Sequence, residues 1–154
     1  NIFTFGTEKC EQMGLGFTDT EGKKQPVYLG SYGIGITRLV GVLVEIFSDS
    51  KGIIWPESVA PFRVHLIALG EDMTDAESVY KSLTDAGIEV LFDDRSGVTA
   101  GEKFADADLL GMPWRVVISK RSLENGGAEV KRRTETEGRI IPLAELVSHV
   151  QASL

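Results

Sequence analysis

The chain has 154 residues and a net charge of −7, with 42% hydrophobic and 25% charged residues. These proportions are typical of a globular protein, and the length corresponds to one domain of usual size or to a small domain with part of another. The acidic balance argues against general affinity for nucleic acids. Every apolar run approaching about 18 residues is interrupted by charge, which predicts no membrane span. The single cysteine, Cys10, excludes an intramolecular disulfide framework and fits a reducing, cytoplasmic compartment.

The first 60 residues predict two or three strands followed by one apolar helix. The expected elements are a strand over 2–5, a short helical turn over 8–13, and a hairpin with arms at 16–20 and 27–29 around a polar turn at 21–24. Because so few strands cannot cover an apolar helix, we expect this part to belong to a larger antiparallel domain. The sequence starts at Asn1 rather than at a methionine, so we expect the chain to be a piece of a longer protein.

A glycine-rich turn over residues 30–35 leads into that helix. Between residues 34 and 47 the only charges are Arg38 and one glutamate, and a helix that is apolar on all faces is expected to be buried. A buried guanidinium needs an anion, and the N–H groups of the turn and of the helix N-terminus favour a phosphate there. The alternatives are that Arg38 pairs with an internal carboxylate and that Gly33 and Gly35 serve close packing.

Two prolines five residues apart, Pro56 and Pro61, forbid a continuous helix and favour an extended connection. We place the domain boundary near Pro61, which divides the chain into residues 1–60 and 61–154. The second part alternates strands and helices. Its expected elements are strands over 64–69, 88–92 and 114–119, helices over 72–86 (Thr74 as N-cap, Gly87 as C-cap), 102–110 and 143–154, and a hairpin of 129–133 with 139–141.

This order predicts an α/β domain with a parallel sheet core, right-handed crossovers and an antiparallel hairpin at one edge. Ligands of such sheets sit beyond the carboxyl ends of the strands, which indicates the loop after Phe92. A flavodoxin-like small-molecule binder would also fit the alternation, but the acidic Glu71 and Asp72 after the first strand would repel phosphate. Residues 95–139 carry nine basic and seven acidic side chains, which predicts either a local basic face or an ordinary solvated surface.

Other single residues carry less chemistry. His65 lies in an apolar strand and is interpreted as a core histidine with satisfied hydrogen bonds, and Cys10 has no base nearby in the sequence. No second histidine or cysteine stands at ligand spacing, so we expect no metal site. Residues 131–133, Lys-Arg-Arg, are interpreted as a solvated edge strand rather than an RNA contact.

Three groups of residues resemble the bacterial-type prolyl-tRNA synthetases, a family of class II aminoacyl-tRNA synthetases. The turn and helix over residues 30–40 are similar to class II motif 3, and residues 52–62 are similar to the link to the C-terminal domain. The anticodon-binding domain of the family is resembled by residues 93–95, 103–108 and 111–113. The resemblance covers essentially the whole chain. It implies an anticodon-binding domain with a mixed, mainly parallel sheet flanked by helices, preceded by a fragment of the antiparallel catalytic domain that includes motif 3.

The resemblance also implies roles for the first part of the chain. Arg38 would be the motif 3 arginine, a catalytic residue that binds the ATP γ-phosphate. Gly33 and Gly35 would let the backbone approach the adenosine, and Ser31 stands near the prolyl pocket, where many members of the family carry a cysteine. The full-length enzyme would be a cytoplasmic homodimer that activates proline with ATP and Mg²⁺ and transfers it to proline tRNA. Motifs 1 and 2 and an editing domain are not found here, so this chain alone is expected to be inactive.

Four residues are predicted to contact the tRNA anticodon, because single-stranded loops are recognised through splayed bases. Arg95 and Lys103 would bind phosphates or guanine edges, Glu102 would accept from a guanine N1–H, and Phe104 would stack on a base or pack in the core. For Asp106 and Asp108 the alternative is capping or ion pairing. A non-catalytic RNA-binding accessory module with the same fold is the rival function, and an intact motif 3 argues against it.

Overall fold

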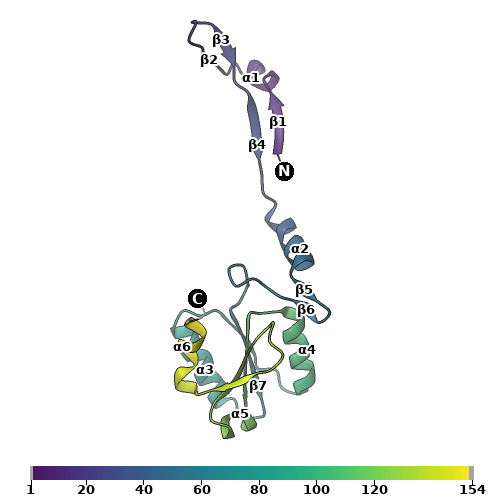
Figure 1. The fold of residues 1–154 in the computed structure, drawn as a ribbon, viewed down its shortest axis with the longest axis vertical. Helices are drawn as coiled ribbons and strands as arrows, with labels where there is room; N and C mark the ends of the chain where they lie inside the picture. Colours follow the sequence, from purple (N-terminus) through teal and green to yellow (C-terminus); the bar gives the residue numbers. More distant parts are fainter. Residues whose placement is uncertain (1, 153–154) are drawn as a thin grey trace. The chain divides into compact units, whose positions relative to one another are not determined.

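The computed structural model describes residues 2–152, which form two compact units divided in the chain between Gly41 and Val42. The first unit contains two small antiparallel sheets, β1–β4 and β2–β3 (Figure 1). Its elements are β1 (Ile2–Gly6), α1 (Glu8–Gln12), β2 (Gly16–Thr18), β3 (Lys24–Pro26) and β4 (Leu29–Tyr32). The predicted first strand, the helical turn and the first arm of the hairpin are confirmed. The second hairpin arm differs, because β3 ends at Pro26 and the strand that begins at Leu29 pairs with β1 instead.

The apolar helix α2 (Ile36–Ile46) spans the division between the units. None of its residues is buried, and Ile36 and Ile46 are 76% and 65% exposed. The prediction of a buried helix is therefore wrong for the chain as described. Apolar residues on every face of a helix favour burial, but burial also requires other elements that cover the helix. The described elements do not cover α2.

The second unit is built on a five-stranded mixed sheet with strand order β11-β10-β9-β7-β8. The strands are β7 (Val64–Leu69), β8 (Val90–Asp93), β9 (Trp114–Ser119), β10 (Ala128–Arg132) and β11 (Arg139–Ile141). Strand β7 lies between β8 and β9 and is parallel to both, and β10 runs antiparallel to both β9 and β11. The predicted parallel core with an antiparallel hairpin at one edge is confirmed.

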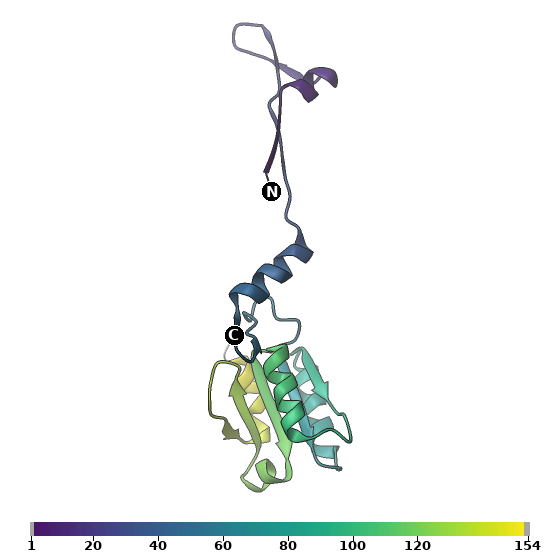
Figure 2. The same cartoon turned by 90° about the vertical axis from the view of Figure 1, so that its right-hand side faces the viewer.

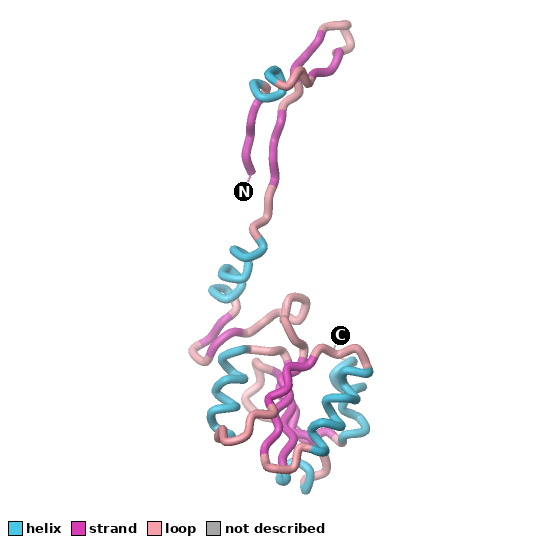
Figure 3. The backbone as a smooth tube through the Cα atoms, turned by 180° about the vertical axis from the view of Figure 1, so that it is seen from behind, coloured by secondary structure: helices cyan, strands magenta, loops and turns pink. Residues whose placement is uncertain are grey.

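Helices cover both faces of this sheet. Figures 1 and 3 show α3 (Thr74–Asp85) and α6 (Leu143–Gln151) on one face and α4 (Ala100–Leu110) on the other, and Figure 2 shows α4 in front of the strands. The start of α3 differs from the prediction, because the Asp72 carboxylate accepts from the N–H of Thr74 and Met73 is the N-cap. Similarly, Ala86 is the C-cap and Gly87 follows it in the left-handed conformation. A short helix, α5 (Lys120–Glu124), was not predicted.

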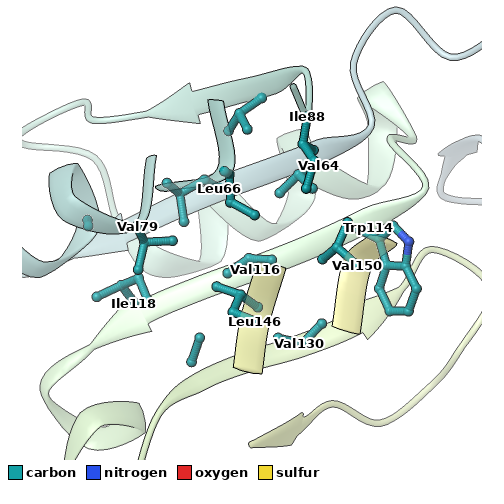
Figure 4. Packing of buried hydrophobic residues seen from close by; sticks show 14 of the residues in the cluster. Val64, Leu66, Val79, Ile88, Trp114, Val116, Ile118, Val130, Leu146 and Val150 are labelled. Carbon is teal, nitrogen blue, oxygen red and sulfur yellow. The ribbon is translucent and has the colours of Figure 1, made fainter. Parts of the chain in front are cut away.

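The hydrophobic core consists of two clusters, one on each face of the sheet, because successive side chains of a strand point to opposite faces. Val64 and Leu66 of β7 point to the α3–α6 face, where they meet Leu146 and Val150 in the larger cluster shown in Figure 4. On the other face, Ile67 packs with a smaller cluster that includes Ala107 of α4. The sheet is therefore fully covered on one face and covered mainly by a single helix on the other. Polar side chains at the flanks of α4 can reach a ligand.

A small hairpin, β5 (Ser48–Asp49) with β6 (Gly52–Ile53), packs against the end of α4. Gly111 has φ +71°, and a Cβ there would overlap the backbone of Ile53. The Trp55 indole N–H donates to the Leu110 carbonyl at 3.0 Å. Arg133 donates to both carboxylate oxygens of Asp49, at 2.7 and 3.0 Å. The hairpin is thus an integral part of the second unit.

Candidate nucleic-acid interface

Arg95 stands just beyond the carboxyl end of β8, in the loop where a ligand was predicted. Its Nε donates to one oxygen of Asp93 at 2.9 Å, and its Nη2 donates to the other at 2.8 Å. The same Nη2 donates to Asp106 of α4 at 2.8 Å. The Arg95 side chain is 48% exposed. Two carboxylates therefore fix an arginine that still faces solvent, and its Nη1 makes no hydrogen bond to any described residue.

The charges of this group reinforce one another. Hydrogen bonds from Arg95 lower the pKa of Asp93 to about 2, against the opposing effect of burial, and the Lys103 ammonium adds to the depression. Hydrogen bonds to Asp93 and then Asp106 raise the pKa of Arg95 above its usual value. Both groups stay ionised near neutral pH, which gives the loop a permanently charged, oriented guanidinium.

Arg95 lies at the rim of a largely apolar cleft of about 380 Å³ on the α4 face of the sheet. The cleft is lined by His65, Leu91, Phe92, Asp93, Arg95, Asp106, Leu109 and Leu110. The ring of Phe92 lies on the opposite face of the sheet, where it stacks on Tyr80 of α3 with a centroid separation of 5.3 Å. A cleft with apolar walls and a few fixed polar groups at its mouth suits a flat ring that carries hydrogen-bond acceptors.

His65 at the base of this cleft is not the satisfied core histidine that the sequence predicted. It is 3% exposed, and its Nδ1 has no hydrogen-bond partner among residues 2–152. Burial lowers its pKa. A neutral imidazole therefore lines the cleft.

A second cavity of about 420 Å³ lies at the carboxyl ends of β7 and β8. Its lining includes Gly70, Glu71, Ser96 and Gly97, and Arg95 borders it as well as the cleft. The arginine can therefore serve a ligand that extends from one hollow to the other.

The structure does not place Lys103 in this interface, in contrast to the prediction. Its side chain is 2% exposed, and its Nζ donates to the carbonyls of Ala68 and Asp93 at 2.9 and 3.2 Å. The Asp93 carboxylate lies 3.4 Å from the same nitrogen. The buried ammonium thus connects the carboxyl ends of β7 and β8 by hydrogen bonds, so Lys103 has a structural role.

Glu102 and Phe104 both make contacts inside the domain, and core packing was the alternative predicted for Phe104. Glu102 accepts from the backbone N–H and the hydroxyl of Thr99, and these hydrogen bonds lower its pKa. Together with the bond from its own N–H to Thr99, they form a capping box at the start of α4. Phe104 is half-buried against Ile67, and the Arg115 guanidinium lies 4.7 Å from its ring centroid. Neither side chain lines the cleft.

The two aspartates of α4 form ion pairs, as their alternative predicted. Asp106 binds Arg95, and Asp108 lies 3.4 Å from Arg115. The role of Asp93 and Asp106 in holding Arg95 was not predicted. The sequence Asp93-Asp94-Arg95 at the end of a strand could have indicated this pair, because a carboxylate can accept hydrogen bonds from an arginine two residues later in the same turn.

In the first unit, Arg38 is exposed in the first turn of α2 and forms no ion pair with a carboxylate of the described residues. Gly33 and Gly35 precede it without positive φ. A Cβ at Gly33 would meet nothing within 4 Å, and one at Gly35 would meet only the Cβ of Arg38, at 3.5 Å. Close packing inside the described chain therefore does not require these glycines. Ser31 lies in β4, exposed and opposite Phe3 of β1.

Neither a metal site nor a membrane-spanning helix is found among the described residues. Among residues 2–152, no group of three or more His, Cys, Asp or Glu side chains is arranged to hold a metal ion. Within the same range, no helix is both long and apolar enough to cross a membrane.

Comparisons with known proteins agree with this geometry. The sequence profile of the family described as "Anticodon binding domain" matches residues 63–153. A proline–tRNA ligase of Dehalococcoides mccartyi is 46% identical over 100% of this chain and 28% of its own length, and one of Parvibaculum lavamentivorans is 50% identical over 89% and 32%. A crystal structure of prolyl-tRNA synthetase from Cryptosporidium parvum, complexed with halofuginone and AMPPNP, matches with a TM-score of 0.81 at 28% identity, over 99% of this chain and 32% of that one.

This chain thus spans about a third of the length of these relatives and is similar to their C-terminal part. The mixed sheet flanked by helices, the profile match and the whole-chain similarity agree. The chain therefore belongs to the anticodon-binding domain family, in the form that proline–tRNA ligases carry.

Proposed function

We propose that residues 61–154 recognise the anticodon of a proline tRNA within a larger proline–tRNA ligase. The single observation that carries this proposal is Arg95, which two carboxylates hold at the rim of an apolar cleft. Its Nη1 retains two N–H donors. Guanine presents two acceptors, O6 and N7, and arginine is the side chain that contacts them most often.

The cleft supplies the second half of recognition. A base that leaves its stack loses ring contacts, and the apolar walls formed by Leu91, Leu109 and Leu110 would replace them. In this proposal Arg95 identifies the base and the cleft accepts its ring. Glu102 and Phe104 lie at the start of α4, where they would contact flanking nucleotides.

The experiment is binding of this chain to a proline tRNA transcript, beside one whose anticodon guanines are replaced, at one fixed salt concentration. We expect Arg95→Ala to weaken binding of the first transcript by about 10- to 100-fold, since a good arginine–guanine contact is worth roughly 1–3 kcal/mol. Binding of the second transcript should change little. Arg121→Ala, at an exposed arginine of α5, is the matched control. Equal losses with both transcripts would refute base recognition by Arg95.

We also propose that residues 1–60 form part of a class II catalytic domain and that Arg38 contacts the γ-phosphate of ATP. The exposed apolar faces of α2 and Arg38, which forms no ion pair within residues 2–152, support this, because both lack the surroundings that a larger domain would provide. Arginine and free N–H groups suit a triphosphate. Mg²⁺ would accompany the nucleotide in this proposal. Activation of proline, dimerisation and a cytoplasmic location belong to the same proposal for the full-length enzyme.

This part is tested in the full-length ligase by ATP–pyrophosphate exchange. Arg38→Ala should abolish exchange while leaving tRNA affinity unchanged, because the arginine acts only on the nucleotide. Exchange at the parent rate would exclude the role of Arg38.

A further inference from the structure

A third cavity, of about 320 Å³, lies beside the C-terminal end of α4 on the side of β10. All of its lining residues belong to the second unit. They are Asp49, Lys51, Ile54, Asp108, Lys131, Arg133, Thr134, Glu135 and Thr136. Four of these residues follow one another in the loop after β10. The lining is polar and rich in charge, unlike that of the apolar cleft on the other flank of α4.

Lys131 is the unusual member of this lining. It alternates with Val130, which lies in the core of the α3–α6 face, so its side chain emerges on the α4 face. The residue is 8% exposed. Its ammonium forms no hydrogen bond or ion pair of ordinary length with any of residues 2–152. The ammonium nitrogen itself is not enclosed, so it faces the cavity as a cation without a direct protein partner, a position that a bound anion would suit.

The neighbours of Lys131 add to the positive charge around its ammonium. Arg115 is directly opposite Lys131 in the β9–β10 register, and like charges in that position repel. Lys51 and Arg133 add two further cations to the cavity. Burial and then the charge of Arg115 lower the pKa of Lys131, while Asp108 acts in the opposite direction.

The carboxylates around the cavity are engaged elsewhere. Asp49 accepts both bonds from Arg133, and Asp108 is shared between Arg115 at 3.4 Å and Lys51 at 4.0 Å. Glu135 accepts from the backbone N–H of Arg132 at 2.9 Å and lies 3.8 Å from Arg139. Lys131 is therefore the cation of the cavity that lacks a direct counter-charge.

We propose that this cavity binds a phosphate group of the RNA backbone, with Lys131 as its central cation. Lys51 and the hydroxyls of Thr134 and Thr136 complete a set of donors for an oxyanion. The proposal deepens the proposed anticodon recognition and rests on it. The cavity and the cleft lie on two flanks of the same helix, and the register places Lys131 two strands from His65, about 10 Å away. One RNA strand can therefore reach both.

The first test measures RNA binding by the full chain as a function of salt, with Lys131→Met and the control Lys120→Met at an exposed lysine of α5. Methionine keeps the length of the stem and removes the charge. Each neutralised phosphate of a single strand contributes a slope of about −0.7 to log K against log salt. We expect Lys131→Met to reduce the slope by about that amount and to weaken binding about fivefold at 0.1 M salt. The loss should be the same for cognate and anticodon-replaced RNA.

The second test follows the Lys131 side-chain amine by lysine-selective NMR, with the signal assigned by its disappearance in Lys131→Met. Inorganic phosphate is titrated against chloride at equal ionic strength, and an anticodon stem-loop RNA is titrated separately. The proposal expects saturable shifts and a raised Lys131 pKa with both. A response to phosphate alone, with an unchanged salt slope, would overturn the RNA assignment, and no response to either would overturn the site. If Lys131 responds to RNA while Arg95→Ala spares base discrimination, the phosphate site stands and the anticodon role of Arg95 fails.

Discussion

Replacing Lys103 by methionine separates the structural role of this residue from the RNA contact that its sequence suggests. The ammonium donates to the Ala68 and Asp93 carbonyls and lies beside the Asp93 carboxylate, all with the side chain 2% exposed. Methionine fills the same volume but leaves these acceptors without a donor. Each hydrogen bond from a charged donor is worth about 1.5–3 kcal/mol. The variant no longer has to bury a charged ammonium, which offsets part of that loss. We therefore expect the free energy of unfolding to fall by roughly 2–4 kcal/mol.

The assay is thermal unfolding of the full chain followed by circular dichroism, with Lys120→Met as the exposed control. A loss of this size should lower Tm by roughly 8–16 °C for a unit of this length. RNA affinity, measured well below the new Tm, should stay within about threefold of the parent value, since a buried amine adds no direct RNA contact. A variant as stable as the parent but deficient in RNA binding would refute this reasoning and restore Lys103 to the interface.

Two further predictions concern stability at acid pH and the close contact of Gly111 with the backbone of Ile53. The folded pKa of Asp93, about 2, lies below its unfolded value of 3.8, so its stabilisation of about 2 kcal/mol is complete above pH 4 and is lost as pH falls towards 2. Urea titrations at pH 5 and 2.5 should show this loss in the parent chain and a smaller one in Asp93→Asn. Gly111→Ala should cost at least about 2 kcal/mol by chemical denaturation, because positive φ adds to overlap with Ile53. Gly97→Ala, at φ +76° in open space, should cost only about 1 kcal/mol.

The sheet of the second unit was predictable because its central strands are short apolar runs between clear breakers. Strands β7 and β9 match the predicted ranges, 64–69 and 114–119, residue for residue. A glycine ends the first run, and Pro113 precedes the second. The missed helix α5 has only five residues, and its start depends on a reciprocal capping box between Ser119 and Ser122. Such a pair of serines is common in loops, so the pattern alone does not distinguish the helix.

The sequence indicated the loop after Phe92 and the start of the next helix as the candidate site, but it did not assign roles to the individual residues. Lys103 and Phe104 are adjacent on α4, and apolar periodicity leaves open which of them faces the sheet. Lys103 is buried together with Ala107, one helical turn later, because the carbonyls at the ends of β7 and β8 accept hydrogen bonds from its ammonium. That decision depends on acceptors from two strands that are distant in the sequence. Lys131 was likewise interpreted as solvated, since its burial depends on the hairpin β5–β6 and on α4.

Asp93 connects the core of this domain to its proposed RNA contact. One carboxylate binds the buried Lys103 ammonium and, through both oxygens, the exposed Arg95 guanidinium. The direction of Arg95 is therefore set by the packing of α4 on the sheet rather than by the loop that carries it. Lysine at position 95 would keep the charge but could not engage both oxygens and Asp106 at once, because it lacks the planar fork. Specificity for a base should for this reason depend on the guanidinium geometry, while phosphate binding at Lys131 requires only a positive charge.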